Sequence, residues 1–318
     1  MFKTSIGFDM RAPDFGPPAS ELYAAALDMC EYADAHGVEQ LNFQEHHGRE
    51  DGYLPTPFIM GAAAAARSKH AAILLGAVIL PLHDPVKVAE MIAVTDLICG
   101  GRLHVALGAG YIEDEFKAFR VSIHDRARLM DEGVEIILRA LRGERFKDGD
   151  REVFVTPLPG NRPPNLYIAG GVPATARRAA KLGVGLYPLT PEITPIYQEE
   201  CRKLGREPGP VVGGGGWVHV SEDPDATWAE IWPHVAHVAR TYAAWSSDPG
   251  NTANPFHGLD SEESIRAAGF YKVVTPDECV TLAKQGSVGL APLMGGLSPK
   301  VGWKNLELYC TKVLPQIS

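Results

Sequence analysis

The chain has 318 residues, of which 45% are hydrophobic and 22% are charged; 30 basic and 39 acidic side chains give a formal net charge of −9. This composition excludes a disordered chain, a collagen-like chain and a small disulfide scaffold, and it allows two average domains or one large α/β barrel. The acidic balance and the absence of a lysine or arginine cluster argue against nucleic acid as a partner.

The sequence also argues against a membrane partner. The longest strongly apolar run, 73–82, is about half of the roughly 20 residues that a membrane-spanning helix needs. The N-terminus lacks the basic and apolar regions of a secretory signal. The five cysteines are widely separated and form no C-x-x-C pair. We therefore expect a cytoplasmic protein with reduced thiols, without a disulfide framework or a zinc site.

Strand-like and helix-like segments alternate along the first half of the chain. Short apolar runs predict strands at 4–8, 38–43, 73–79 and 103–107. Helical periodicity follows the first strand, and an alanine-rich helix is predicted at 57–67. A third helix begins at Asp84-Pro85, an N-cap followed by proline, and ends at Gly100-Gly101.

The second half repeats this alternation. Strands are predicted at 165–169, 185–188, 217–220 and 287–290, and helices at 125–141, 173–182, 191–204, 226–245 and 301–314. Eight strand-then-helix units predict an α/β fold, a single (β/α)8 TIM barrel that spans 1–318.

Two stretches exceed the short loops of a minimal barrel and are predicted as insertions. The first, 142–164, is rich in glycine, proline and charge and is expected to carry a small hairpin at 146–155. The second, 246–275, is expected to be a long mobile loop and a candidate lid over the site.

Glycines follow two of the predicted strands, at the barrel end where active sites lie. Gly170-Gly171 ends a strand just before a helix with proline in its first turn, which suits a phosphate because helix N-termini present free N–H groups. A plain βα turn that needs positive φ explains these glycines equally well. Ala109-Gly110 follows the fourth strand, but a Rossmann fingerprint would need glycine where Glu113 stands.

Glu45-His46-His47 is the most distinctive polar cluster, and it follows the second strand. One imidazole can serve as an acid, a base or a hydrogen-bond donor in the barrel mouth while the other braces the loop. A metal site is the rival interpretation. We disfavour it because zinc hydrolase barrels usually open with His-x-His on the first strand, which is absent here, so no metal is expected.

Six segments in register resemble the bacterial luciferase-like flavin monooxygenase family. They are Glu45-His46-His47, 75–81, 83–90, Gly100-Gly101-Arg102-Leu103, 108–116 and Ile168-Ala169-Gly170-Gly171. The similarity runs in order across nearly the whole chain.

The resemblance implies reduced FMN, or a deazaflavin coenzyme, with its ring in the barrel mouth. The phosphate would lie at Gly170, Gly171 and Thr175, and the ring would rest on Gly76-Ala77, where the family commonly has a non-proline cis peptide. Phe8 would line the substrate side, and Ala109 and Gly110 complete the implied cofactor-binding set. His46 is the implied catalytic residue, with His47 and Glu45 in support.

The sequence departs from the luciferase subunit at two places. Ala109 stands where that subunit has an arginine that binds the phosphate, and Gly170-Gly171 replaces an acidic residue and a serine. The glycine version recurs among relatives that use deazaflavin, so the choice of flavin stays open and light emission is not implied.

Three hypotheses for the function follow. The leading one is a flavin-dependent monooxygenase that receives reduced FMN from a separate reductase and oxidises a small organic substrate with molecular oxygen. The second is a deazaflavin-dependent hydride-transfer oxidoreductase, and the third is a flavin-binding protein without catalysis. The family also implies a homodimer. The expected pocket walls are apolar and indicate a hydrophobic substrate: Phe8, Tyr53, Leu54, Phe58, Tyr111 and Phe256.

Overall fold

The computed structural model describes residues 2–213, 216–245, 259 and 261–317. Its helices and strands, in chain order, are β1 (Thr4–Phe8), α1 (Ala19–Ala35), β2 (Gln40–Phe43), α2 (Pro57–Arg67), β3 (Ala72–Ile79), α3 (Pro85–Cys99), β4 (Leu103–Gly108), α4 (Glu113–Ala118), α5 (Arg126–Leu141), β5 (Phe146–Asp148), β6 (Arg151–Val153), β7 (Asn165–Gly170), α6 (Pro173–Leu182), β8 (Gly185–Pro188), α7 (Ile193–Lys203), β9 (Trp217–Val220), α8 (Pro224–Trp245), α9 (Glu262–Ala268), β10 (Tyr271–Val274), α10 (Pro276–Gln285), β11 (Val288–Leu290) and α11 (Pro299–Leu308).

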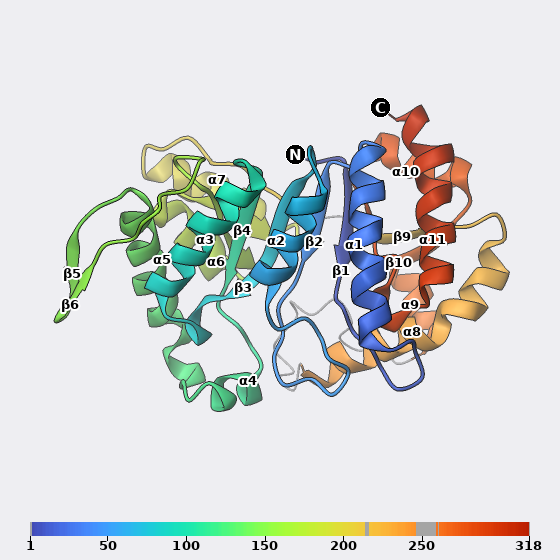
Figure 1. The fold of residues 1–318 in the computed structure, drawn as a ribbon, viewed down its shortest axis with the longest axis horizontal. Coiled ribbons are helices and arrows are strands. Elements are labelled where there is room, and N and C mark those ends of the chain that lie inside the picture. Colours follow the sequence, from blue (N-terminus) through green and yellow to red (C-terminus); the bar gives the residue numbers. More distant parts are fainter. Residues whose placement is uncertain (1, 214–215, 246–258, 260, 318) are drawn as a thin grey trace.

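The main sheet consists of nine parallel strands in the order β10-β9-β11-β1-β2-β3-β4-β7-β8. Helices α1, α2, α3 and α11 cover its outer face (Figure 1). The eight predicted strands are all present, and the predicted α/β barrel fold is confirmed. Within the described residues no ladder joins β8 to β10, so the hydrogen-bonded sheet is open at that seam.

The second predicted insertion needs a correction, because 261–275 is not a loop. Helix α9 begins with a capping box in which Ser261 and Ser264 bond each other's backbone N–H, and β10 pairs with β9 in parallel. Glu262 accepts a hydrogen bond of 2.7 Å from the indole N–H of Trp228, which fixes α9 to α8. The remainder of the predicted lid, 246–258 and 260, lies outside the described residues.

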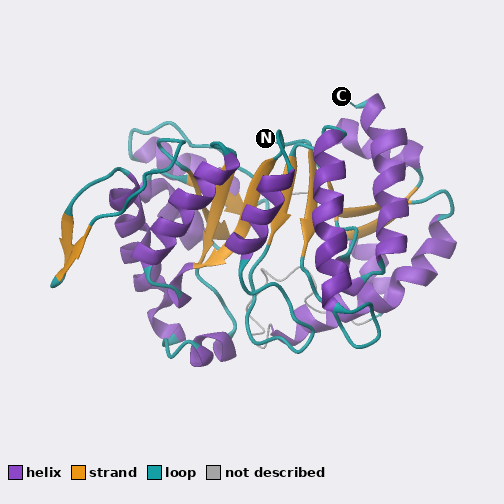
Figure 2. Ribbon diagram, in the orientation of Figure 1, coloured by secondary structure: helices purple, strands orange, loops and turns teal. Residues whose placement is uncertain are grey.

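The first insertion carries the predicted hairpin. Strands β5 and β6 pair antiparallel and project away from the barrel (Figures 1 and 2). The guanidinium of Arg145 lies 3.6 Å from the centre of the Phe154 ring, a cation–π contact at the base of the hairpin.

Helix α3 shows how local sequence sets the ends of an element. The Asp84 carboxylate accepts a hydrogen bond of 2.8 Å from Val86 N, and Pro85 occupies the first helical position. Gly100 ends the helix at φ 63°, in the left-handed region that glycine adopts at the lowest cost. Both predicted ends are confirmed.

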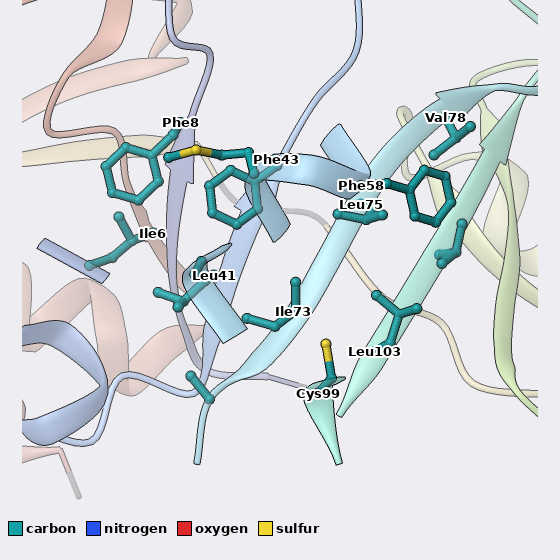
Figure 3. Close-up of a cluster of buried hydrophobic side chains, with 14 of the residues drawn as sticks. Ile6, Phe8, Leu41, Phe43, Phe58, Ile73, Leu75, Val78, Cys99 and Leu103 are labelled. Carbon is teal, nitrogen blue, oxygen red and sulfur yellow. The ribbon is translucent and has the colours of Figure 1, made fainter. Parts of the chain in front are cut away.

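Strand side chains alternate between the helix layer and the barrel interior. Ile6, Phe8, Leu41 and Phe43 belong to a core cluster that also contains buried residues of α1, α2 and α3 (Figure 3). A separate cluster inside the barrel contains Leu74, Ala106, Tyr167, Ala169 and Val212. The interior is therefore filled below the end where the strands terminate.

All five cysteines are free and buried. Among the described helices, none combines the length and the apolar character that crossing a bilayer would require.

Candidate functional site

The segment between β2 and α2 forms one side of the barrel mouth, beside α4 (Figure 1). The hydrogen bonds that hold its backbone include one from His46 N to Leu54 O at 3.1 Å and one from Leu54 N to Asp9 O at 3.0 Å. The second bond ties this segment to the end of β1. The predicted residues Glu45, His46 and His47 are therefore all buried near the strand ends.

His46 is held by Glu115, a residue of α4 that lies 69 positions further along the chain. His46 Nδ1 lies 2.9 Å from Glu115 Oε1, and the same oxygen accepts a hydrogen bond of 2.9 Å from His47 N. A carboxylate can only accept, so the proton of a neutral His46 ring lies on Nδ1 and the lone pair on Nε2. Glu115 is 1% exposed, and among the described residues its Oε2 has no hydrogen-bond partner.

The electrostatic surroundings favour a neutral His46. Burial lowers the pKa of His46 below its usual range; the Glu115 carboxylate opposes this shift, and the Arg11 and Arg49 guanidinium groups add to it. With its pKa lowered, His46 at neutral pH is an imidazole whose Nε2 is an acceptor nitrogen. Such a group can accept a proton or a hydrogen bond from a ligand on the side of the ring opposite Glu115.

Aromatic rings surround His46. The centroid distances from its ring are 4.7 Å to Tyr53, 4.7 Å to Trp245, 5.9 Å to Tyr111 and 6.1 Å to Tyr242. Behind them lies Arg11, which is fully buried, donates a hydrogen bond of 2.9 Å to Asp51 and packs 4.5 Å from the centre of the Tyr53 ring. These groups leave His46 8% exposed, and burial of this kind strengthens electrostatic interactions.

Glu45 joins two other histidines. Its Oε1 lies 2.7 Å from His47 Nε2 and 2.6 Å from His83 Nε2, while its Oε2 accepts a hydrogen bond of 2.9 Å from Ile79 N. His47 thus directs Nε2 at Glu45, an arrangement that braces the loop.

The middle of β3 has an irregular backbone. The Gly76-Ala77 peptide is cis, and the pairing with β4 shifts register between Gly76 and Val78. Ala77 is partly exposed in a strand whose other residues are buried. A Cβ at Gly108 would lie 3.2 Å from the Ala77 Cβ, so the neighbouring strand approaches closely because it has no side chain there. Small residues and an accessible surface fit a planar ring system.

The backbone at Gly170 lies close to the side chain of Thr175. Its φ is +154°, and a Cβ there would lie 2.5 Å from Thr175 Oγ1, so only glycine is accommodated. The Gly170 carbonyl accepts a hydrogen bond from Leu189 N, and the Gly171 carbonyl accepts one from the Thr190 hydroxyl. Because the carbonyls face β8 and the first turn of α6 is exposed, the accessible backbone fits an anion.

The predicted residues divide into two groups. Around the mouth lie His46, His47, Gly76 and Ala77, while Ala109 and Gly110 follow β4 and are partly exposed. Phe8 does not join them, because it is 2% exposed and stacks on Phe43 at 5.8 Å in the helix-facing core (Figure 3). Of the predicted walls, Tyr53 and Tyr111 contact His46. Phe256 lies outside the described residues.

The sequence matches the luciferase-like monooxygenase family over residues 7–285. It is 25% identical to limonene 1,2-monooxygenase of Rhodococcus erythropolis, over 92% of this chain and 81% of the relative. It is 26% identical to the oxygenase component of the flavin-dependent trigonelline monooxygenase of Acinetobacter baylyi, over 58% of this chain and 52% of the relative.

Solved structures share the fold. Monooxygenase RslO1 from Streptomyces bottropensis superposes with a TM-score of 0.76 and 24% identity, over 99% of this chain and 100% of its own. The oxygenating constituent of 3,6-diketocamphane monooxygenase from Pseudomonas putida, in complex with FMN, gives 0.73 and 17% over the full length of both chains. An F420-dependent secondary alcohol dehydrogenase with an F420–acetone adduct also gives 0.73, with 18% identity over 99% of both chains.

The family match covers most of the chain, and the predicted resemblance is confirmed. The predicted enzyme class, an oxidoreductase that incorporates molecular oxygen, agrees with the family's description. The chain belongs to the luciferase-like monooxygenase family.

Proposed function

We propose that the protein is the oxygenase of a two-component flavin monooxygenase, which uses reduced FMN and molecular oxygen to oxidise a small hydrophobic organic molecule. The observation that carries this proposal is the buried His46, oriented by Glu115 at 2.9 Å and enclosed by aromatic rings. A separate reductase would supply the reduced flavin, as the term oxygenase component indicates for the trigonelline enzyme.

The residues of this chain divide the work of binding. Gly76, Ala77, Ala109 and Gly110 would hold the flavin ring, since they offer small side chains within β3 and just after β4, and all but Gly76 are partly exposed. At the end of β7, Gly170, Gly171 and Thr175 would hold the phosphate. A local seat of backbone N–H groups is needed because the protein is acidic overall.

Bound reduced FMN would supply the electrons that activate molecular oxygen. His46 would accept or return a proton at Nε2 while Glu115 keeps the Nδ1 proton in place. The rings of Tyr53, Tyr111 and Trp245 would keep water away and provide an apolar wall for the substrate. His47 would act through its bond to Glu45 to hold the loop that carries His46.

The second candidate function is hydride transfer with a deazaflavin coenzyme. The comparison that favours it is the F420-dependent alcohol dehydrogenase, whose TM-score equals that of the FMN complex. Anaerobic titration of the protein with reduced FMN and with reduced deazaflavin separates the two, because the true cofactor binds much more tightly. Tight deazaflavin binding without FMN binding would refute the oxygenase proposal.

A rapid-mixing experiment tests the role of His46. Protein with bound reduced FMN is mixed with oxygen, and flavin reoxidation is followed by absorbance for the wild type and for His46→Asn. We expect the substitution to leave FMN affinity nearly unchanged and to alter the reoxidation rate, whereas His124→Asn at an exposed position changes neither. Reoxidation at the rate of free FMN in all three proteins would instead support the third hypothesis, a flavin-binding protein without catalysis.

We also propose that the protein forms a homodimer through the outer surface of α2 and α3. Four large apolar side chains on these helices are exposed: Ile59 by 71%, Val94 by 45%, Leu97 by 47% and Ile98 by 48%. Exposed apolar side chains gathered on neighbouring helices are typical of interaction surfaces. Sedimentation velocity of the wild type and of Leu97→Lys tests this, with a wild-type monomer as the refuting result.

A further inference from the structure

The carboxylate of Glu45 and the imidazoles of His47 and His83 converge at one point beside the mouth. Glu45 Oε1 lies 2.7 Å from His47 Nε2 and 2.6 Å from His83 Nε2, and all three ligand atoms lie within 4.8 Å of one another. They come from two different strand ends, because Glu45 and His47 follow β2 and His83 follows the 3-10 turn Leu80–Leu82 after β3.

Among the described residues, neither an arginine nor a lysine forms an ion pair with the Glu45 carboxylate. Glu45 is 3% exposed, so its carboxylate is shielded from solvent. Within the described part of the chain, its only ion-pair partners are His47 and His83. A buried carboxylate that pairs with imidazoles rather than with an arginine or a lysine favours a bound cation.

We propose that Glu45, His47 and His83 bind a divalent transition metal ion through Oε1 and the two Nε2 atoms. Two imidazoles and one carboxylate are a donor set that Zn²⁺ prefers, with bond lengths of about 2.0–2.2 Å. Tetrahedral bonds of that length place ligand atoms about 3.3 Å apart, so the two short contacts would each widen by less than about 1 Å. The fourth position would hold water, because His83 is partly exposed and offers an entry path.

The surroundings also suit a metal ligand set. Ile79 N donates to the second carboxylate oxygen of Glu45 and so fixes the direction of Oε1. The Phe119 ring lies 4.5 Å from the His47 ring and 6.1 Å from the His83 ring, which gives the site an apolar cover. The imidazoles would bind the ion through Nε2 with their ring protons on Nδ1, and the ion would replace the Nε2–H hydrogen bonds to Glu45.

Such an ion would connect the end of β2 to the segment after β3. The end of β2 carries His46, and the segment after β3 continues the strand that contains Gly76-Ala77, so the ion would stiffen the mouth. The inference does not depend on the proposed oxygenase function, because it uses neither flavin nor oxygen.

The test is metal binding by the full chain after treatment with a chelator. Zn²⁺ is titrated by calorimetry, and Co²⁺ is titrated by its visible absorption spectrum. We expect one ion per chain, with affinity at least about tenfold weaker in Glu45→Gln and in His83→Asn, and unchanged in His124→Asn, which replaces an exposed histidine elsewhere. Circular dichroism checks that each variant is folded.

The Co²⁺ spectrum identifies the ligands, since thiolate ligands add an intense charge-transfer band that nitrogen and oxygen ligands lack. The expected spectrum has no such band. No binding by the folded wild type would overturn the proposal and leave the cluster as a hydrogen-bonded triad. Binding that survives both substitutions, or a thiolate band, would overturn it as well.

Discussion

Replacing Glu115 by glutamine tests whether this residue controls the state of His46. The substitution keeps the shape of the side chain, removes the charge and places an amide N–H₂ group beside the ring. Glu115 is 1% exposed and bonds both His46 Nδ1 and His47 N at 2.9 Å. Because the carboxylate raises the pKa of His46 against the effect of burial, its removal should lower that pKa further.

The size of the effect follows from the bond that is weakened. A hydrogen bond to a charged group contributes about 1.5–3 kcal/mol, and a neutral acceptor supplies about half of that. Losing about 0.8–1.5 kcal/mol of preference for the Nδ1–H form would slow a step that needs a free Nε2 by roughly four- to twelvefold. Glu113→Gln on the same helix, at an exposed position, is the matched control and should change nothing.

Two measurements check this prediction. Histidine-labelled NMR titration follows the pKa of His46 without any knowledge of the substrate, and rapid mixing with oxygen follows the flavin reaction. Glu115→Asp should restore part of the wild-type behaviour because it keeps the charge. A His46 pKa that rises or stays constant in Glu115→Gln, together with an unchanged flavin reaction, would refute the assigned role of Glu115.

Three further predictions address binding and stability. Gly170→Ala should weaken FMN binding and destabilise the protein by about 1–3 kcal/mol, because the new Cβ would lie 2.5 Å from Thr175 Oγ1. The control is Gly149→Ala, at a position where φ is +58° and no atom lies within 4 Å of the new Cβ. A fluorescence titration with FMN should show unchanged affinity for this control. Ala77→Leu should abolish FMN binding without lowering Tm, and unchanged affinity would show that the ring lies elsewhere. Burial lowers the pKa of His219 from 6.5 to about 4. As the pH falls, His219 is therefore protonated in the unfolded chain before it is protonated in the folded protein. The free energy of unfolding should fall by about 3 kcal/mol between pH 6.5 and pH 4. Urea unfolding of His219→Phe at several pH values should show a smaller decrease, and an identical decrease would contradict this pKa shift.

The strands and most helices could be predicted because their signals are local. The apolar run 73–79 predicts a strand, and Asp84-Pro85 predicts the start of a helix, from only a few adjacent residues in each case. Strand β10 was missed because Tyr271–Val274 is short and only its first residue is buried, so neither length nor periodicity distinguishes it from a loop. The Ser261-x-x-Ser264 capping box was the available signal for α9.

The candidate site was only partly predictable. Glu45, His46 and His47 form one cluster in the sequence, but Glu115 lies in a short helix whose exposed acidic neighbours hide it. Arg11 was missed for a similar reason, since nothing in the sequence shows that tyrosine and tryptophan rings would surround it. Contacts between residues 69 positions apart depend on the whole barrel, and a single sequence does not record them.

The buried cysteines make this protein convenient for site-specific labelling. Burial raises the pKa values of Cys99, Cys279 and Cys310 to about 12, so these thiols remain protonated and unreactive toward maleimide reagents in the native state. A single cysteine introduced at the tip of the β5–β6 hairpin would then be the preferred target. A fluorophore or spin label attached there would lie away from the barrel mouth and would report on the whole molecule without blocking it.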